Sequence, residues 1–81
     1  MNMEISNEYF RTTDLCLASY LLAKDSLFTG INKDSSGRAT FLFPITDKCK
    51  QLIKEFTETK ALVEPMAFFS AQKQLKHLLY L

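Results

Sequence analysis

The side chains that could carry out catalysis or bind a metal are few in this chain of 81 residues. His77 is its one histidine, and its two cysteines, Cys16 and Cys49, each lie within an apolar helical pattern. Nucleophilic catalysis needs a nucleophile, a base and an orienting group in one pocket, and a zinc site needs about four closely spaced ligands. Because an apolar environment makes a thiol inert, we expect reduced, buried cysteines and a surface or half-buried His77. The sequence therefore predicts no catalytic residue, no metal site and no cofactor.

Two carboxylates stand where predicted helices begin. Asp14 follows two threonines at a strand-to-helix corner, and Glu64 precedes Pro65. An acid–base dyad would form only if the fold brought the two together. An aspartate at a helix start usually accepts hydrogen bonds from the free backbone amides, and we expect this of Asp14. An enzyme is therefore the least favoured hypothesis.

The basic side chains raise nucleic-acid binding as a hypothesis. The formal net charge of +1 excludes a strong overall field, but residues 45–81 hold six lysines against four acids. The candidates for phosphate contacts are Arg11, Lys33, Arg38, Lys50, Lys54, Lys73 and Lys76. On an open sheet face, Tyr9, Phe41 or Phe43 would stack bases. The competing interpretation, which we favour, puts these rings in the core and the lysines on an ordinary solvated surface.

The first half of the chain is predicted to hold a helix and most of a sheet. Residues 9–13 favour a short strand, and an apolar helix follows it to Lys24. Strand-like runs at residues 27–33 and 38–44 flank Asp34-Ser35-Ser36-Gly37, which is typical of a hairpin turn. Both faces of the second run carry apolar groups, so we expect both faces to be at least partly covered.

The second half is predicted to hold two further helices. Thr46 caps the first, whose apolar residues follow the helical spacing without a miss. The second begins at Glu64-Pro65, with the proline in the first turn, and carries an apolar stripe toward the C-terminus. Between the two helices, Ala61–Val63 could pair as an edge strand.

The resulting element order is β-α-β-β-α-(β)-α, and the fold class is α+β. With the fourth strand, the layout is ferredoxin-like with an added C-terminal helix; without it, helices cover a three-stranded sheet. The helix over residues 15–24 is apolar nearly all round, so its outer side must be covered by the last helix or by a second copy in a homodimer. Residues 1–8 are expected to be a flexible N-terminus and residues 9–81 a single domain.

Targeting signals are not evident in the sequence. The chain does not open with a basic stretch followed by an apolar run. Its longest apolar stretch is far shorter than the about 20 residues of a membrane span. Two cysteines make a poor disulfide framework for a secreted domain. We therefore expect a cytoplasmic protein without membrane contact.

Several segments carry a resemblance to known sequences. They are YFRTTDLCLASYLLAK (9–24), LFTGIN (27–32), ATFLFP (39–44), LIKEF (52–56), ALVEP (61–65) and LKHLLY (75–80). The chain thereby resembles a family of small, uncharacterised prokaryotic and phage-associated proteins with a domain of unknown function. The resemblance implies a phage or mobile-element context, but no activity, cofactor or site residue.

These observations predict a small, non-enzymatic interaction module that binds a macromolecular partner. The partner is a protein or a nucleic acid, and its identity does not follow from the residues. The alternative is a small nucleic-acid-binding accessory protein that uses the basic residues named above.

Overall fold

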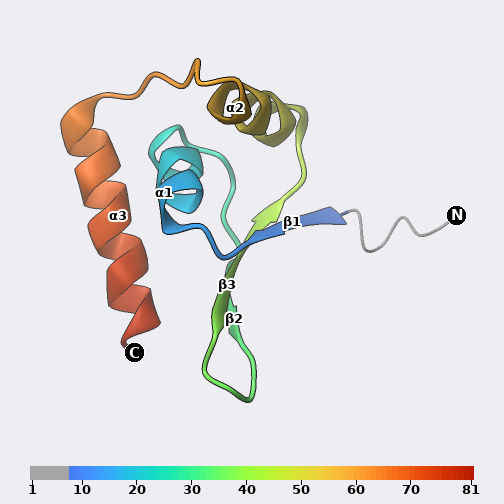
Figure 1. Cartoon of the computed structure of the whole chain (residues 1–81), viewed down its shortest axis with the longest axis vertical. Coiled ribbons are helices and arrows are strands. Elements are labelled where there is room, and N and C mark those ends of the chain that lie inside the picture. Colours follow the sequence, from blue (N-terminus) through green and yellow to red (C-terminus); the bar gives the residue numbers. More distant parts are fainter. Residues whose placement is uncertain (1–7) are drawn as a thin grey trace, which may run out of the picture.

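The strands and helices follow the predicted order and confirm the α+β fold class (Figure 1). The computed structural model describes residues 8–81. Its elements are β1 (Tyr9–Thr12), α1 (Leu15–Ala23), β2 (Gly30–Lys33), β3 (Ala39–Pro44), α2 (Asp47–Thr57) and α3 (Pro65–Leu79). The predicted flexible N-terminus, residues 1–8, lies outside the described residues except for Glu8, whose carbonyl accepts a hydrogen bond from the Ile45 amide at 2.8 Å. Over the described range, no helix is long and apolar enough to cross a membrane.

The sheet that residues 8–81 form has three strands in the order β1-β3-β2, and both pairs are antiparallel. The ferredoxin-like alternative is therefore wrong, because Ala61–Val63 does not join the sheet. This segment follows Thr59, where a positive φ of 57° turns the chain away from the axis of α2. It then crosses to α3 on a path away from the strands (Figure 1), with the Leu62 side chain exposed.

Each helix begins at a residue whose side chain caps it. The Asp14 carboxylate accepts hydrogen bonds from two backbone amides, at 2.9 and 3.2 Å, and Thr46 Oγ1 accepts one at 3.0 Å. Glu64 caps α3 through bonds of 3.1 and 2.8 Å, and Pro65 follows it in the first turn. Such caps contribute about 0.5–2 kcal/mol each because they satisfy amides that would otherwise lack a partner. They confirm the predicted roles of Asp14 and Thr46.

The β2–β3 hairpin turns at the predicted loop. The Asp34 carboxylate accepts hydrogen bonds from the Ser36 hydroxyl (2.6 Å), the Ser36 amide (2.9 Å) and the Arg38 amide (3.0 Å). These bonds, the one from the Ser36 side chain above all, hold the pKa of Asp34 below its ordinary value. Gly37 and Gly30 have backbone φ angles of 87° and 143°, which residues other than glycine rarely adopt. The strand expected from residue 27 therefore begins only at Gly30.

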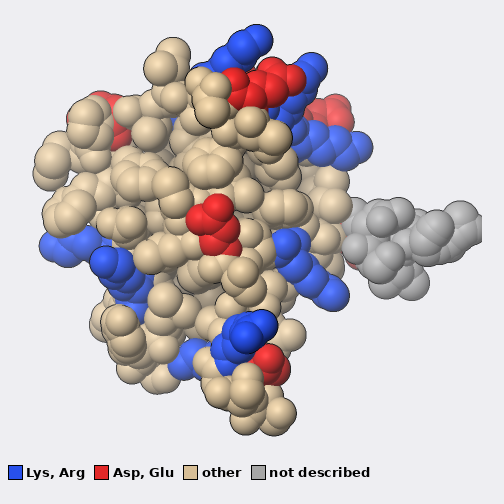
Figure 2. Space-filling model, viewed as in Figure 1, with Lys and Arg blue, Asp and Glu red and all other residues tan. Residues whose placement is uncertain are grey.

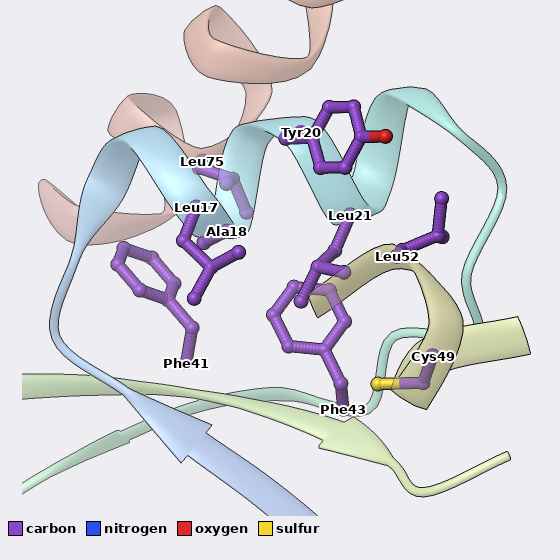
Figure 3. Packing of buried hydrophobic residues seen from close by; sticks show 9 residues of the cluster. All are labelled: Leu17, Ala18, Tyr20, Leu21, Phe41, Phe43, Cys49, Leu52 and Leu75. Carbon is purple, nitrogen blue, oxygen red and sulfur yellow. The ribbon is translucent and has the colours of Figure 1, made fainter. Parts of the chain in front are cut away.

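The core lies between the sheet and α1, and α3 covers the outer side of α1 (Figure 1). Phe41 and Phe43 extend from β3 toward α1, and Cys49 of α2 lies beside Phe43 (Figure 3). The buried core consists of Leu17, Ala18, Tyr20, Leu21, Phe41, Phe43, Cys49, Leu52 and Leu75. Leu75 is the residue of α3 in this cluster, and Ala71 of the same helix is also buried. The predicted cover for the apolar first helix is therefore supplied by the last helix of the same chain.

The second face of the sheet is open among residues 8–81. Strand alternation puts Tyr9, Arg11, Thr40, Leu42 and Pro44 on this face. Leu42 and Pro44 are half-buried, yet none of the five belongs to the core or packs against it. The helices pack on the other face only, and the half-buried Thr40, Leu42 and Pro44 agree with the expectation that this face is at least partly covered.

The two cysteines lie in different environments. Both are free thiols, and Cys49 is buried as expected. Cys16 is exposed, contrary to the prediction, although its neighbours Leu15 and Leu17 pack against or within the core.

Candidate interaction surface

An apolar groove runs between α3 and the segment that joins α1 to β2. It has a volume of about 530 Å³ and is open to solvent along one side. The residues that line it are Leu22, Phe28, Lys73, Gln74, His77 and Leu78. Ligand sites in proteins typically span about 300–1,000 Å³, so the groove is large enough to receive several apolar side chains.

The walls of the groove are held in place by the core. Phe28 stacks on Phe43, with ring centroids 5.1 Å apart and an angle of 47° between the rings. Leu22 and Leu78 also pack against the buried core. The groove is thus shaped by side chains that already have packing partners, which reduces the cost of ordering them when something binds.

Apolar side chains are exposed on α3 beside the groove. Met66 and Phe69 are 64% and 50% exposed, and their spacing of three residues places them one above the other on the outward face. The Lys73 ammonium lies 5.4 Å from the centre of the Phe69 ring, a favourable cation–π distance. Isolated exposed apolar residues are ordinary, whereas large exposed apolar side chains on a helix that also lines an apolar groove are typical of an interaction site.

The charges on α3 have one sign. Lys73 and Lys76 are exposed, and residues 65–81 contain no aspartate or glutamate. Across residues 8–81, the structure has one ion pair, between Lys60 and Glu58 at 3.8 Å. The two lysines of α3 therefore have no carboxylate partner in the described part of the chain. Figure 2 shows basic side chains over this helix.

The seven predicted phosphate contacts do not form one surface. Lys50 and Lys54 project from α2, whereas Lys73 and Lys76 project from α3. Figure 2 shows separate groups of basic side chains over α2, over α3 and at the hairpin, with acidic side chains beside the group on α2. A phosphate backbone would have to follow several faces of the molecule to meet all of them.

The basic residues of the sheet are also divided. Lys33 and Arg38 line a hollow of about 430 Å³ next to the end of α3. Lys33 Nζ donates hydrogen bonds to the backbone oxygens of Leu79, at 2.9 Å, and Leu81, at 3.3 Å, and so ties the last turn of α3 to the hairpin. Arg11 does not join this pair, because the strand register places it on the open face of the sheet while Lys33 faces the helices.

The aromatic candidates for base stacking separate in the same way. Phe41 and Phe43 are buried in the core, so the interpretation as core residues is correct for both. Tyr9 is 39% exposed on the open face. Tyr9 is therefore the candidate among the three whose ring a base could reach.

The residues considered for catalysis lie apart and have other roles. Asp14 and Glu64 are occupied as helix caps. His77 is exposed on the wall of the groove, which no cysteine lines. For residues 8–81, no group of three or more His, Cys, Asp or Glu side chains is placed to hold a metal ion.

A polar contact between helices fixes the position of α2. The Tyr20 hydroxyl donates to Glu55 Oε1 at 3.2 Å, and the Gln51 amide donates to Glu55 Oε2 at 3.1 Å. Burial, followed by the hydrogen bond to Glu55 and the charge of Glu55, raises the pKa of Tyr20 above its ordinary value of 10.0. The Tyr20 ring also packs on Phe56, with centroids 5.8 Å apart. This contact ties α1 to α2 and lies outside the groove.

Comparison with known protein families shows which family the chain matches. The model of a domain of unknown function, DUF5659, matches residues 7–81. The chain belongs to the DUF5659 family. This confirms the resemblance to a family of small proteins with a domain of unknown function that the sequence segments indicate. No curated protein and no solved structure matches the chain.

The sequence alone does not single out the groove of this DUF5659 domain. Leu22 and Leu78 resemble ordinary core residues of helices, and Phe28 resembles part of a strand. The available signal is the absence of acids from residues 65–81. The absence of acids and the exposed Phe69 both direct attention to α3, the helix that lines the groove.

Proposed function

We propose that this DUF5659 domain is a non-enzymatic interaction module that binds a macromolecular partner. Its binding surface would consist of the groove together with Met66, Phe69, Lys73 and Lys76, hereafter the α3 surface. The observation that carries the proposal is that one helix, α3, both lines an apolar groove and exposes two large apolar side chains. Protein interfaces commonly have apolar anchors at the centre and polar groups at the rim.

The energetics favour binding at this place. Each Å² of apolar surface removed from water contributes about 25 cal/mol. Because Phe28, Leu22 and Leu78 already pack on the core, little conformational freedom remains to be lost on association. Neither argument applies to the outward face of α2, whose exposed residues are mainly charged or polar.

Site-specific photocrosslinking tests the proposal. A photoreactive benzoylphenylalanine replaces Phe69 in the full chain, and a matched control carries it at Lys48 on the exposed face of α2. In cells that naturally produce the protein, we expect a discrete adduct from position 69, which excess unmodified protein suppresses, and none from position 48. Adducts of the same masses from both positions, or none from position 69, would contradict the proposal.

The open face of the sheet favours a second candidate, single-stranded nucleic-acid binding. Tyr9 and Arg11 lie on this face, and β1, β2 and β3 contain no acidic residue. An exposed ring can stack on a base while a guanidinium contacts phosphate. Phosphate contacts make affinity fall as salt rises. Absence of binding at low salt, or an affinity independent of salt, would remove this candidate.

The biological setting is proposed on separate grounds. A phage or mobile-element origin rests on the resemblance of residues 9–24, and the genes that flank family members would test it. A cytoplasmic location rests on the composition of the chain and would be tested by fractionation. A homodimer stays a prediction, since α3 already covers α1; light scattering at high concentration would give a mass of 9.3 kDa for a monomer.

A further inference from the structure

We infer that the α3 surface binds an acidic, amphipathic helix of a partner protein, whose apolar side chains enter the groove while its carboxylates lie beside Lys73 and Lys76. This inference rests on the proposed function and names the chemistry of the partner. It is carried by the juxtaposition of an apolar groove with a helix whose charges are all positive.

The shape of the groove suits the apolar edge of a helix. Leu22 and Phe28 line the groove on one side, Leu78 of α3 lines it on the other, and the groove is open to solvent. Helices that bind in grooves insert side chains spaced at i, i+3 or i+4, and i+7. Met66 and Phe69 extend the apolar surface along the outward face of α3, so a helix lying along α3 would cover them as well.

The charge around the groove selects an acidic partner. Of the elements that form its walls, α3 bears Lys73 and Lys76, and the end of α1 with its following loop bears Lys24 and Asp25. Lys73 lines the groove, whereas Lys76 lies on the same face of α3 as Phe69, seven residues before it. These elements thus carry three lysines and one aspartate. The lysines of α3 have no carboxylate partner within residues 8–81, so carboxylates at the rim would gain charge-assisted contacts and set the orientation of the bound helix.

The same charges disfavour the other occupants. A second copy that packed symmetrically through α3 would bring Lys73 and Lys76 of both subunits together with no acid between them. A nucleic acid would satisfy the lysines, but its phosphates would leave Leu22, Phe28 and Leu78 uncovered. An acidic, amphipathic helix satisfies both the lysines and the apolar walls.

Titration of the ¹⁵N-labelled full chain with two synthetic helical peptides tests the inference. One peptide carries leucines at helical spacing flanked by glutamates, and its partner replaces every glutamate with lysine. We expect the glutamate peptide to shift the NMR signals of the backbone amides of residues 22, 28 and 73–78. We expect the lysine peptide to bind more weakly. A double variant, K73E/K76E, should lower affinity for the glutamate peptide about five- to tenfold, as expected for two exposed charge contacts turned repulsive, and should prefer the lysine peptide.

The variant K50E/K54E is the matched control. It makes the same change in net charge on exposed residues of α2, so it should keep the affinity for the glutamate peptide within about twofold. Circular dichroism of both variants checks that the fold is retained. An equal loss of affinity in both double variants would overturn the inference, because the effect would then be a general field and not a local contact.

The remaining outcomes separate the inference from the proposed function. If the lysine peptide binds the groove as well as the glutamate peptide, the inference is overturned while the α3 surface stays a binding surface. If neither peptide shifts the amide signals of the groove residues, the inference is again overturned. Crosslinking at position 69 then tests the proposed function separately. Shifts of the groove residues on raising protein concentration alone, or on adding oligothymidylate, would replace the acidic helix by a second copy or by a nucleic acid.

Discussion

The contact between Tyr20 and Glu55 allows a quantitative test of how α2 is held. In the variant Tyr20→Phe, the ring keeps its packing on Phe56 and loses only the hydroxyl that donates to Glu55 at 3.2 Å. A hydrogen bond to a charged group contributes about 1.5–3 kcal/mol. This one is long, and Glu55 is half-buried, so water partly replaces the lost donor. We therefore expect the free energy of unfolding to fall by about 1 kcal/mol, which lowers the melting temperature by about 4–8 °C in a domain of this size.

The pH dependence of the same variant gives an independent check. The pKa of Tyr20 is raised in the folded state, so the folded protein holds the phenol proton more tightly than the unfolded chain does. The stabilisation is complete below the ordinary value of 10.0 and is lost as the pH rises through the higher folded value. The stability difference between wild type and Tyr20→Phe should therefore shrink as the pH rises above 10.0.

Urea unfolding followed by far-ultraviolet circular dichroism measures both effects. The control is Tyr80→Phe, because the Tyr80 side chain is 83% exposed and its hydroxyl has no recorded partner in the described part of the chain. An unfolding midpoint of Tyr20→Phe equal to that of wild type, or an equal loss in Tyr80→Phe, would refute this account of the α1–α2 contact.

Three further substitutions have defined expected outcomes. Ser26→Ala should raise the free energy of unfolding by about 0.5–1 kcal/mol, because the buried Ser26 hydroxyl has no hydrogen-bond partner among residues 8–81; an unchanged or lower urea midpoint would count against this. Lys33→Met should speed amide hydrogen exchange in the last turn of α3, because it removes the bonds to the oxygens of Leu79 and Leu81; unchanged protection there would show that Lys33 does not hold the turn. Gly30→Ala should cost about 1–3 kcal/mol by strain, because φ is 143° although the space around the glycine is open; a thermal melt identical to wild type would contradict the assigned backbone conformation.

The features that the sequence predicts well depend on near neighbours in the chain. The caps at Asp14 and Thr46 and the turn at Asp34 involve partners within four residues, so residue type and position suffice to predict them. The alternation of Phe41 and Phe43 against Leu42 follows from strand geometry in the same way. These local rules account for the element order and for the identity of most core residues.

The features that the sequence does not predict depend on contacts between distant segments. Lys33 is a basic residue of the kind that contacts phosphate. In the structure, its Nζ instead donates hydrogen bonds to backbone oxygens 46 and 48 residues away. The groove needs Leu22, Phe28 and α3 to meet, and the apolar stripe of α3 does not specify which other element it packs against. Ala61–Val63 has strand-like residues, but the turn at Thr59 leads the chain away from the sheet edge.

The packing of α3 on α1 also has a consequence for biosynthesis. Residues 24–64 separate the two helices in the chain, so a ribosome makes the sheet, α1 and α2 before the cover of α1 exists. Until α3 emerges, the nascent chain exposes an apolar helix to solvent, a condition that favours aggregation or capture by a chaperone. Truncated forms that end before Pro65 should therefore accumulate as insoluble material or be degraded, even though every strand is present.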